Sequence, residues 1–238
     1  MKILVAGCSF AEHLSPIIQQ KIPQARITNR ATWGVGNKFI SDSVVLSTLD
    51  DTYDVVYVSW TGFSRYDVCI DPSNKSFFDG YPIQKNLFNR RYVCTGGTGG
   101  WDYHEHPAAN MLFTGFHKLV NDEQLHYNSL LEIIKIQRYL EQLGTPFYFT
   151  SFINQFTSST DNMVEHTCEY GTTRYPQNNH LVDKIDFSRW ILDNNNNGIH
   201  EAVKQLGMIG ADKFHPNPEG YRYWMDLFVT RLKNDKIL

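Results

Sequence analysis

The sequence has little of what marks several large classes of protein. Only four of its 238 residues are cysteine, and no two form a Cys-x-x-Cys pair, which argues against a zinc ribbon and a dense disulfide frame. It carries 22 basic and 25 acidic residues, for a formal net charge of −3, and it has no basic stripe. No apolar run approaches the ~18 residues that a membrane span needs. We therefore expect no nucleic-acid partner and no membrane span.

Motifs for common cofactors are also missing. The first apolar segment is not followed by Gly-x-Gly-x-x-Gly, so a dinucleotide site is not indicated. The glycine-rich run at 96–100 lacks the Lys-Ser/Thr ending of a phosphate-binding loop. His104 and His106 have a spacing that can bind a metal on a strand, but the sequence fixes no third ligand, and a solvated loop is the simpler interpretation. We expect no cofactor and no metal.

No stretch rich in proline and serine divides the chain, which favours a single domain over residues 1–238. The apolar run at 1–7 is too short for a secretory signal and ends in a polar turn. Together with the scattered cysteines, this run favours a soluble protein that stays in a reducing, cytoplasmic compartment.

The apolar segments predict strands that alternate with helices. The expected strands cover 3–6, 24–28, 54–60 and 147–152, and the expected helices cover 38–49, 122–143 and a final segment that starts at Asn217-Pro218. The helix over 122–143 is the clearest, because its apolar residues recur at helical spacing and Gly144 follows it. This alternation predicts a three-layer α/β domain with a mostly parallel sheet.

Two stretches do not fit that pattern. Residues 67–120 and 153–197 are expected to be long insertions on the loop side of the sheet. Loops of this length in a compact domain are usually functional or disordered. Because open α/β sheets bind ligands beyond the carboxyl ends of their strands, we expect the insertions to wall a binding pocket.

Three residues suggest nucleophilic catalysis. Ser9 follows the first apolar strand, and Asp212 stands three residues before His215, just ahead of the final helix. On a turn, that spacing lets the carboxylate reach one ring nitrogen of the histidine and leaves the other nitrogen for the serine. The pattern predicts Ser9 as the nucleophile, His215 as its general base and Asp212 as the group that orients the base.

Each of these residues also has a simpler interpretation. A serine after a strand often only caps the next helix, and Asp-x-x-His is a common turn motif. Cys8 is an alternative nucleophile, since thiolates are intrinsically more nucleophilic. Neighbouring strand positions point to opposite faces, however, which favours Cys8 as a small buried hydrophobic residue.

The chain resembles the SGNH (GDSL-type) hydrolases, a superfamily of esterases, lipases, carbohydrate deacetylases and acyltransferases. The resemblance lies in residues 7–10, with Cys8 where aspartate is more usual, in residues 29–34, and in residues 212–216. It implies a flavodoxin-like three-layer fold and a catalytic role for Ser9, Asp212 and His215. It also implies an oxyanion hole that takes backbone N–H groups from Ser9 and Gly34.

The chain departs from that family after its central strand. The family has Gly-x-Asn-Asp there, whereas this chain has Trp-Thr-Gly-Phe-Ser-Arg over residues 60–65. The missing oxyanion donor could then be the hydroxyl of Thr61, an N–H of the Thr61-Gly62 turn, or the side chain of Asn37. Arg65 could bind the oxyanion or a substrate carboxylate; the alternatives are an ion pair with Asp67 or a plain surface position.

Three tryptophans are candidates for the pocket wall, namely Trp33, Trp60 and Trp101. Buried core positions explain them equally well, because tryptophan is a large and mostly apolar side chain.

The sequence as a whole favours a serine esterase that cleaves a small-molecule or carbohydrate ester, an O-acetyl group being one candidate. Two other functions stay open. An acyltransferase would use the same residues with a sugar hydroxyl in place of water. A binding module could keep the fold without catalysis, because a fold alone does not fix a function.

Overall fold

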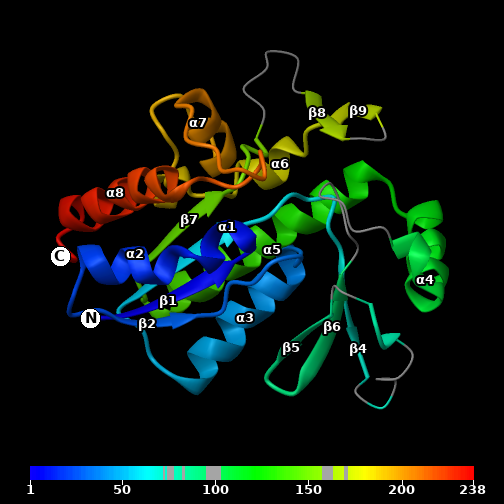
Figure 1. Ribbon diagram of the computed structural model, residues 1–238, viewed down its shortest axis with the longest axis horizontal. Helices are drawn as coiled ribbons and strands as arrows, with labels where there is room; N and C mark the ends of the chain where they lie inside the picture. The colour runs from blue at the N-terminus through cyan, green and yellow to red at the C-terminus, as the bar shows by residue number, and fades with distance from the viewer. Residues whose placement is uncertain (72, 74–77, 82–83, 95–102, 157–162, 169–170) are drawn as a thin grey trace.

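The computed structural model describes residues 1–238 apart from 72, 74–77, 82–83, 95–102, 157–162 and 169–170. Its centre is a sheet of four parallel strands in the order β2-β1-β3-β7 (Figure 1). These strands are β1 (Lys2–Gly7), β2 (Arg26–Asn29), β3 (Val55–Trp60) and β7 (Phe147–Ser151). A parallel bridge between Phe149 and Trp190 extends the sheet beyond β7. This is the strand order of flavodoxin-like doubly wound sheets.

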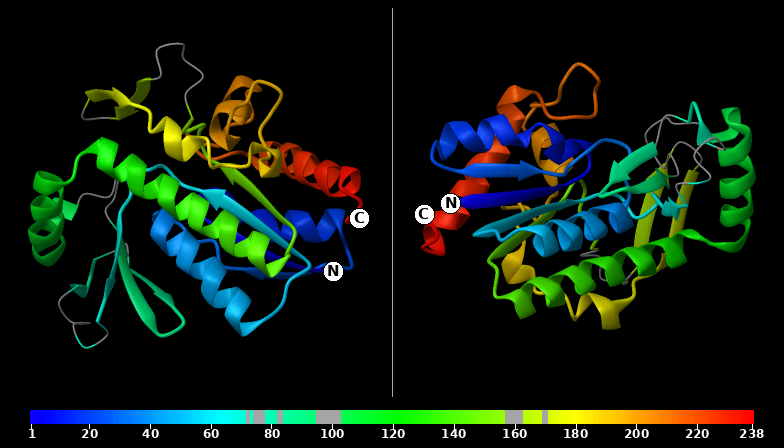
Figure 2. Two further views of the ribbon diagram at one scale, coloured as in Figure 1. Left: turned by 180° about the vertical axis from the view of Figure 1, so that it is seen from behind. Right: turned by 90° about the horizontal axis from the view of Figure 1, so that it is seen from below.

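Helices cover both faces of this sheet, as the view from below makes plain (Figure 2). On one face α2 (Leu14–Lys21) packs beside α8 (Pro218–Asn234), and on the other α3 (Asn37–Asp50) packs beside α5 (Asp122–Leu143). The expected three-layer α/β fold with a mostly parallel sheet is therefore confirmed.

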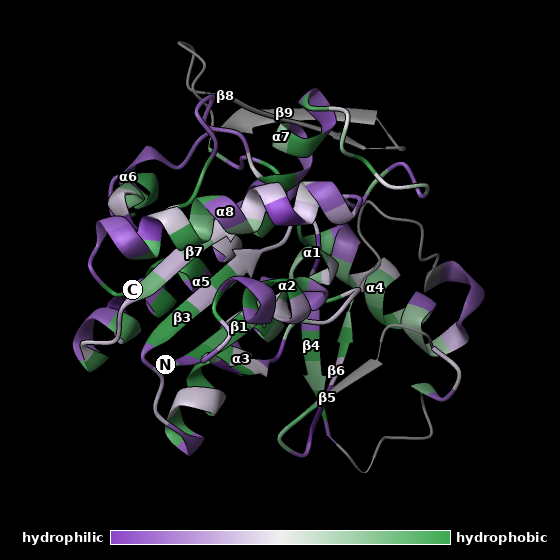
Figure 3. Ribbon diagram, turned by 60° about the vertical axis from the view of Figure 1, so that its left-hand side comes forward, coloured by the Kyte–Doolittle hydropathy of each residue, from purple (hydrophilic) through white to green (hydrophobic). Residues whose placement is uncertain are grey.

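Burial of apolar strands explains why the sheet lies at the centre. Every residue of β3 and of β7 is buried, as a strand covered by helices on both faces requires. Figure 3 shows hydrophobic residues gathered along these strands and polar residues on the outward helix faces. No helix in the part of the chain that the structure describes is long and apolar enough to cross a membrane.

Local signals set the ends of the two long helices. The Asn121 side chain accepts a hydrogen bond from the backbone N–H of Gln124 at 2.9 Å, and Gly144 ends α5 in the left-handed conformation at φ +67°. The Asn217 side chain caps α8 in the same way through the N–H of Gly220 at 2.9 Å. The bounds of α5 agree with the helix that the sequence predicts.

The first insertion has a fold of its own. Its three strands are antiparallel in the order β4-β6-β5, and a short helical turn and a longer helix follow them. The elements are β4 (Asp67–Ile70), β5 (Gln84–Leu87), β6 (Arg90–Cys94), η2 (Tyr103–Glu105) and α4 (Pro107–Leu119). A separate apolar cluster joins β6 to α4 through Val93, Ala109 and Phe113. The glycine-rich run at 96–100 lies outside the described residues.

The second insertion and the C-terminal region add short elements. In chain order they are β8 (Met163–Cys168), β9 (Gly171–Pro176), α6 (Asn179–Val182), η3 (Phe187–Arg189) and α7 (Ile199–Gln205). At the other end of the chain, the short helix α1 (Ser9–Glu12) follows β1. β8 and β9 pair as an antiparallel hairpin. The described parts of both insertions thus contain regular elements, whereas the sequence suggested long loops.

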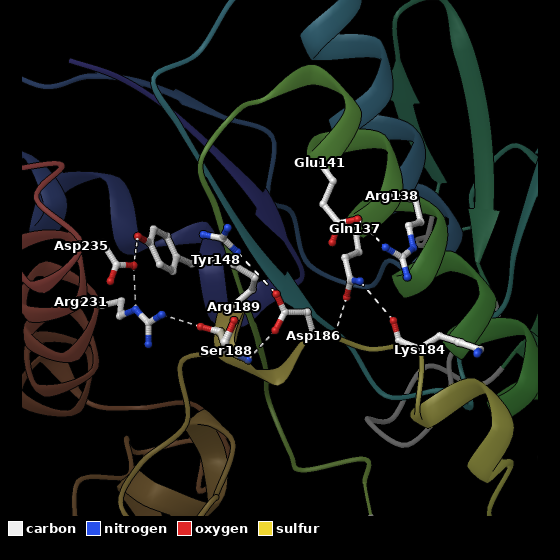
Figure 4. A network of polar contacts seen from close by, with 10 residues as sticks. All are labelled: Gln137, Arg138, Glu141, Tyr148, Lys184, Asp186, Ser188, Arg189, Arg231 and Asp235. Atoms are coloured by element: carbon white, nitrogen blue, oxygen red, sulfur yellow. Dashed lines mark hydrogen bonds and ion pairs between the residues drawn. The ribbon is translucent and has the colours of Figure 1, made fainter.

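A polar network ties the end of α8 to β7 and η3 (Figure 4). The Tyr148 hydroxyl donates to an Asp235 carboxylate oxygen at 2.5 Å, and Arg231 Nε donates to the same oxygen at 2.9 Å. Arg231 also donates to the Ser188 carbonyl at 2.5 Å. Burial, followed by the bond to Asp235, raises the pKa of Tyr148 to about 12. The network therefore holds a neutral phenol against a carboxylate.

A second part of the network ties η3 to α5. The Gln137 amide donates to the Lys184 carbonyl at 3.2 Å and accepts from the backbone N–H of Asp186 at 2.8 Å. Because the amide carries both a donor and an acceptor, this one side chain ties the segment before η3 to the helix by two hydrogen bonds. The C-terminal segments that follow are thereby anchored to the sheet and to α5.

Candidate active site

Ser9 lies at the carboxyl edge of the central sheet, where β1 turns into α1. Its exposed fraction is 8 %. A Cβ atom added to Gly7 would lie 2.8 Å from the Ser59 carbonyl and 2.8 Å from the Ala11 side chain. Only glycine allows the end of β1 to approach β3 and α1 this closely. The sequence Gly-Cys-Ser therefore makes a tight strand-to-helix turn that presents Ser9.

The segment before α8 forms a turn around the Asp212 carboxylate. Its Oδ1 atom accepts hydrogen bonds from the backbone N–H groups of Phe214 at 3.0 Å and His215 at 2.9 Å. The Gly210 N–H closes the turn on the His215 carbonyl at 2.7 Å. Lys213 takes the left-handed conformation at φ +61°, which lets the chain reverse within so few residues.

The structure brings Ser9, His215 and Asp212 into one hydrogen-bonded chain. His215 Nδ1 lies 2.6 Å from Asp212 Oδ2, and His215 Nε2 lies 2.7 Å from Ser9 Oγ. Because an ionised carboxylate can only accept, Nδ1 is assigned the proton and Nε2 is left to accept from the serine hydroxyl. In this arrangement the imidazole can take the serine proton.

The charge on Asp212 follows from its hydrogen bonds. The N–H of Phe214 and the side chain of His215 lower the pKa of Asp212 to about 2. Its side chain is half exposed, with 52 % of its surface accessible, so water screens part of this effect. At neutral pH the carboxylate is therefore ionised and can orient the imidazole and balance the charge it gains.

Aromatic side chains fix the His215 ring from two sides. The Phe10 ring lies 4.9 Å from it in a tilted arrangement, and the Phe214 ring lies 5.2 Å from it edge-on. These two phenyl rings also contact each other at 5.3 Å. Such packing restricts rotation of the imidazole and shields its face from water.

The loop from Asn29 to Gly36 runs beside the end of β1. The backbone N–H of Thr32 donates to the Gly7 carbonyl at 3.1 Å, and the Asn29 side chain accepts from the N–H of Ala31 at 2.9 Å. Gly34 is buried and has a φ of +75°, a conformation that glycine adopts without strain. The resemblance to the SGNH hydrolases implied this glycine as an oxyanion donor, and that role stays a prediction.

Asp67 at the start of β4 anchors the same loop, a role that sequence reasoning missed. Its carboxylate accepts from the N–H of Gly36 at 2.8 Å and from the N–H of Phe39 at 2.8 Å. Burial raises its pKa, while these two hydrogen bonds oppose that rise. No spacing signal pointed to this contact, because the two segments are 31 residues apart.

Asn37 lies beside Thr61 but is not available as an oxyanion donor. Its Nδ2 donates to the Thr61 carbonyl at 3.2 Å and to Ser129 Oγ at 3.1 Å, while its Oδ1 accepts the Thr61 N–H at 2.9 Å. The expectation that Asn37, or the N–H of Thr61, reaches the oxyanion is therefore wrong, since these groups bind each other. Gln155 adds a bond from Nε2 to the Thr61 carbonyl at 2.6 Å.

The Thr61 hydroxyl, unlike the backbone N–H and carbonyl of that residue, is not bound by Asn37 or Gln155. It is buried, and among the described residues it makes no hydrogen bond to a nitrogen or oxygen atom. It lies close enough to Cys8 to oppose the rise that burial causes in the pKa of the Cys8 thiol. The role of this hydroxyl as an oxyanion donor stays a prediction.

Arg65 is half-buried behind the loop. One guanidinium nitrogen donates to the Val35 carbonyl at 3.4 Å, and its charge also acts on Asp67 and Cys8. Together with Lys38 it lines a cavity of about 210 Å³ between α3 and α5. The role of Arg65 towards a substrate stays a prediction.

The three candidate tryptophans have different surroundings. Trp60 is fully buried and packs edge-on against Phe149 at 5.5 Å, so the expectation that it lines a substrate pocket is wrong. A residue of a strand covered on both faces cannot reach solvent. Trp33 is partly exposed and packs against the apolar cluster of the first insertion. Trp101 lies outside the described residues.

Within the described residues, no group of three or more His, Cys, Asp or Glu side chains is arranged to hold a metal ion. His104 Nδ1 instead lies 3.1 Å from the Asn110 side chain, and His106 Nε2 lies 2.9 Å from the Asp79 carbonyl. Both histidines are thus engaged in structural hydrogen bonds around the start of α4.

No family model and no curated protein matches this chain. Among solved structures, it is similar to TesA at 10 % identity, with a TM-score of 0.49 over 98 % of this chain and 99 % of that chain. It is also similar to the acetyl xylan esterase AlAXEase at 12 % identity, with a TM-score of 0.45 over 97 % of this chain and 98 % of that chain. Neither likeness is close enough to carry a function over, so the function has to follow from the geometry of the site.

Proposed function

We propose that this protein is a serine ester hydrolase of the SGNH type, with Ser9 as nucleophile, His215 as general base and Asp212 as the orienting carboxylate. The single observation that carries the proposal is the continuous chain of 2.7 Å and 2.6 Å contacts from Ser9 Oγ through the imidazole to Asp212. A serine that only capped α1 would not need a histidine held at its hydroxyl. The Cys8 side chain makes no capping bond at α1 either.

The proposed reaction has two balanced halves. Ser9 Oγ attacks the ester carbonyl carbon while His215 Nε2 takes the hydroxyl proton, and a tetrahedral oxyanion forms. Collapse of this intermediate breaks the ester bond, and the departing alcohol takes the proton from His215. Water then attacks the acyl-enzyme and gives a proton to His215, after which Ser9 leaves with that proton and the acid is released.

The oxyanion needs donors, and we assign them to the backbone N–H groups of Ser9 and Gly34 and to the Thr61 hydroxyl. The positive φ of Gly34 and the contact of its loop with Gly7 support the second donor. The position of Thr61 directly after β3 supports the third, because the family has its asparagine in the segment that follows that strand. Loss of one such donor commonly lowers turnover by about 10²- to 10³-fold.

The substrate in this proposal is a small-molecule or carbohydrate ester, with an O-acetyl group as the first candidate. Trp33 can contribute an aromatic face, since it is partly exposed beside the loop that carries Gly34. Arg65 can bind a carboxylate or assist the oxyanion, since its guanidinium lies near enough to Cys8 to lower the pKa of that thiol, against the larger effect of burial. These two residues are the proposed substrate contacts.

A fluorophosphonate probe tests the proposal, because it phosphonylates only an activated serine. We expect one adduct per wild-type chain in intact mass spectra and none on Ser9→Ala or His215→Ala. The His215 variant is informative because it keeps the serine and removes only its base. Folded wild-type protein that takes up no probe would contradict the proposal and favour a binding module.

The pH dependence of kcat/KM should show a single ionisation on its acid side. Asp212, with a pKa lowered to about 2, stays ionised above about pH 3, so the loss of its charge does not contribute to a fall in kcat/KM above that pH. We expect kcat/KM on the acid side to fall by no more than about tenfold for each pH unit, which is the slope of one essential ionisation. A twofold steeper slope would mean that a second group must also be ionised.

A further inference from the structure

Helix α7 begins against the carboxyl end of β7, and its first turn is fixed there. A Cβ atom on Gly198 would lie 2.7 Å from the Ser151 carbonyl, so only glycine permits this contact. The backbone N–H of His200 donates to the Phe152 carbonyl at 2.7 Å. Glu201 accepts from the N–H groups of both Gly198 at 2.8 Å and Asn154 at 2.7 Å. His200 therefore stands on a rigid base.

The imidazole of His200 reaches from this base to the turn that carries Asp212 and His215. Its Nδ1 lies 2.8 Å from the Phe214 carbonyl oxygen. A carbonyl can only accept, so Nδ1 is assigned the proton. The imidazole ring of His200 also contacts the phenyl ring of Phe214, with the ring centroids 5.0 Å apart.

This contact fixes one peptide group at both of its ends. The carbonyl of Phe214 belongs to the same peptide unit as the N–H of His215, and that N–H donates to Asp212 Oδ1 at 2.9 Å. Because a peptide unit is planar, holding its oxygen and its N–H fixes the plane. The plane in turn sets the direction in which His215 projects its ring towards Ser9.

We infer that His200 is a positioning residue for His215, acting through the Phe214 carbonyl. This inference rests on the proposed function, because it concerns the same reaction. His200 does not touch the reacting atoms; it holds the peptide from which the general base projects. A shift of about 1 Å in a catalytic group can lower turnover by about 10²-fold, so the loss of this bond should lower kcat more than it weakens substrate binding.

Two replacements of His200 separate the hydrogen bond from the packing. His200→Phe keeps an aromatic ring against Phe214 and removes the N–H, whereas His200→Asn keeps an N–H donor near the position of Nδ1. In p-nitrophenyl acetate hydrolysis, we expect kcat of the Phe variant to fall by roughly ten- to hundredfold with little change in KM. In His200→Asn, kcat should return most of the way from the value of the Phe variant to that of the wild type. His200→Leu removes the donor a second way if the Phe variant does not fold.

His106 provides a matched control. Its ring Nε2 also donates to a backbone carbonyl, that of Asp79 at 2.9 Å, and the ring also contacts two aromatic rings, Phe78 and Tyr81. It lies at the start of α4 in the first insertion, so His106→Phe should leave kcat unchanged. Far-ultraviolet circular dichroism of each variant checks that the fold is kept.

The inference is overturned if His200→Phe keeps the wild-type kcat, if His200→Asn loses as much as His200→Phe, or if His106→Phe loses as much as either. Wild-type protein without any turnover that depends on Ser9 would overturn the proposed function and this inference together. Turnover that depends on Ser9 but is unaffected by His200→Phe would overturn only the role of His200, so the two failures are distinguishable.

Discussion

Replacing Ser9 with alanine should lower kcat for p-nitrophenyl acetate by about 10⁴-fold or more. The alanine side chain cannot form the acyl-enzyme, so the residual rate comes only from the oxyanion donors and from binding. The Ser9 hydroxyl makes one described side-chain hydrogen bond, that to His215 at 2.7 Å, and its loss should leave the fold intact. Steady-state kinetics with a thermal melt of the same samples measures both effects.

Cys8 is the matched control, because it is the neighbouring residue and the rival nucleophile. Its thiol is 1 % exposed, and burial raises its pKa, so it is neither accessible nor ionised at neutral pH. Cys8→Ala should therefore keep its turnover. Undiminished activity in Ser9→Ala would refute the assignment of the nucleophile, and a loss confined to Cys8→Ala would transfer that role to the thiol.

Features that depend on neighbouring residues could be predicted from the sequence. The bounds of α5 follow from apolar residues at helical spacing and from Gly144, and both signals lie within the segment itself. The turn around Asp212 is also local, because its carboxylate binds N–H groups two and three residues away. The strands β1 and β3 follow from two continuous apolar runs that must both be buried.

Features that depend on distant segments could not be predicted. Asn37 was expected to face the oxyanion, but the structure pairs it with Thr61, 24 residues away, and with Ser129, 92 residues away. The place of Trp60 depends on whether helices cover both faces of β3, which the tryptophan itself does not reveal. The contact of His200 with Phe214 likewise requires α7 to lie against β7, and no short motif encodes that arrangement.

Replacing Asp212 with asparagine should lower kcat by about 10²- to 10⁴-fold. The amide can still accept the two backbone N–H groups through its oxygen, so the turn should persist. Its NH₂ group then faces His215 Nδ1, which must become an acceptor, and the ring proton moves to Nε2. In that tautomer Nε2 cannot take the proton of Ser9. The half-exposed position of Asp212 lets water compensate in part, which sets the lower end of the range.

Asp193 allows the charge of Asp212 to be separated from its role in the turn. Its Oδ1 also accepts two backbone N–H groups, those of Asn195 at 2.9 Å and Asn197 at 2.7 Å, but its side chain makes no described bond to a histidine. Asp193→Asn should thus lose about as much stability as Asp212→Asn does, but its kcat should stay at the wild-type value. If both variants lose turnover equally, Asp212 acts only by shaping its turn. If Asp212→Asn alone loses kcat and its melting temperature matches that of Asp193→Asn, the loss lies in the tautomer and charge of His215, because the backbone contacts of the two carboxylates are alike.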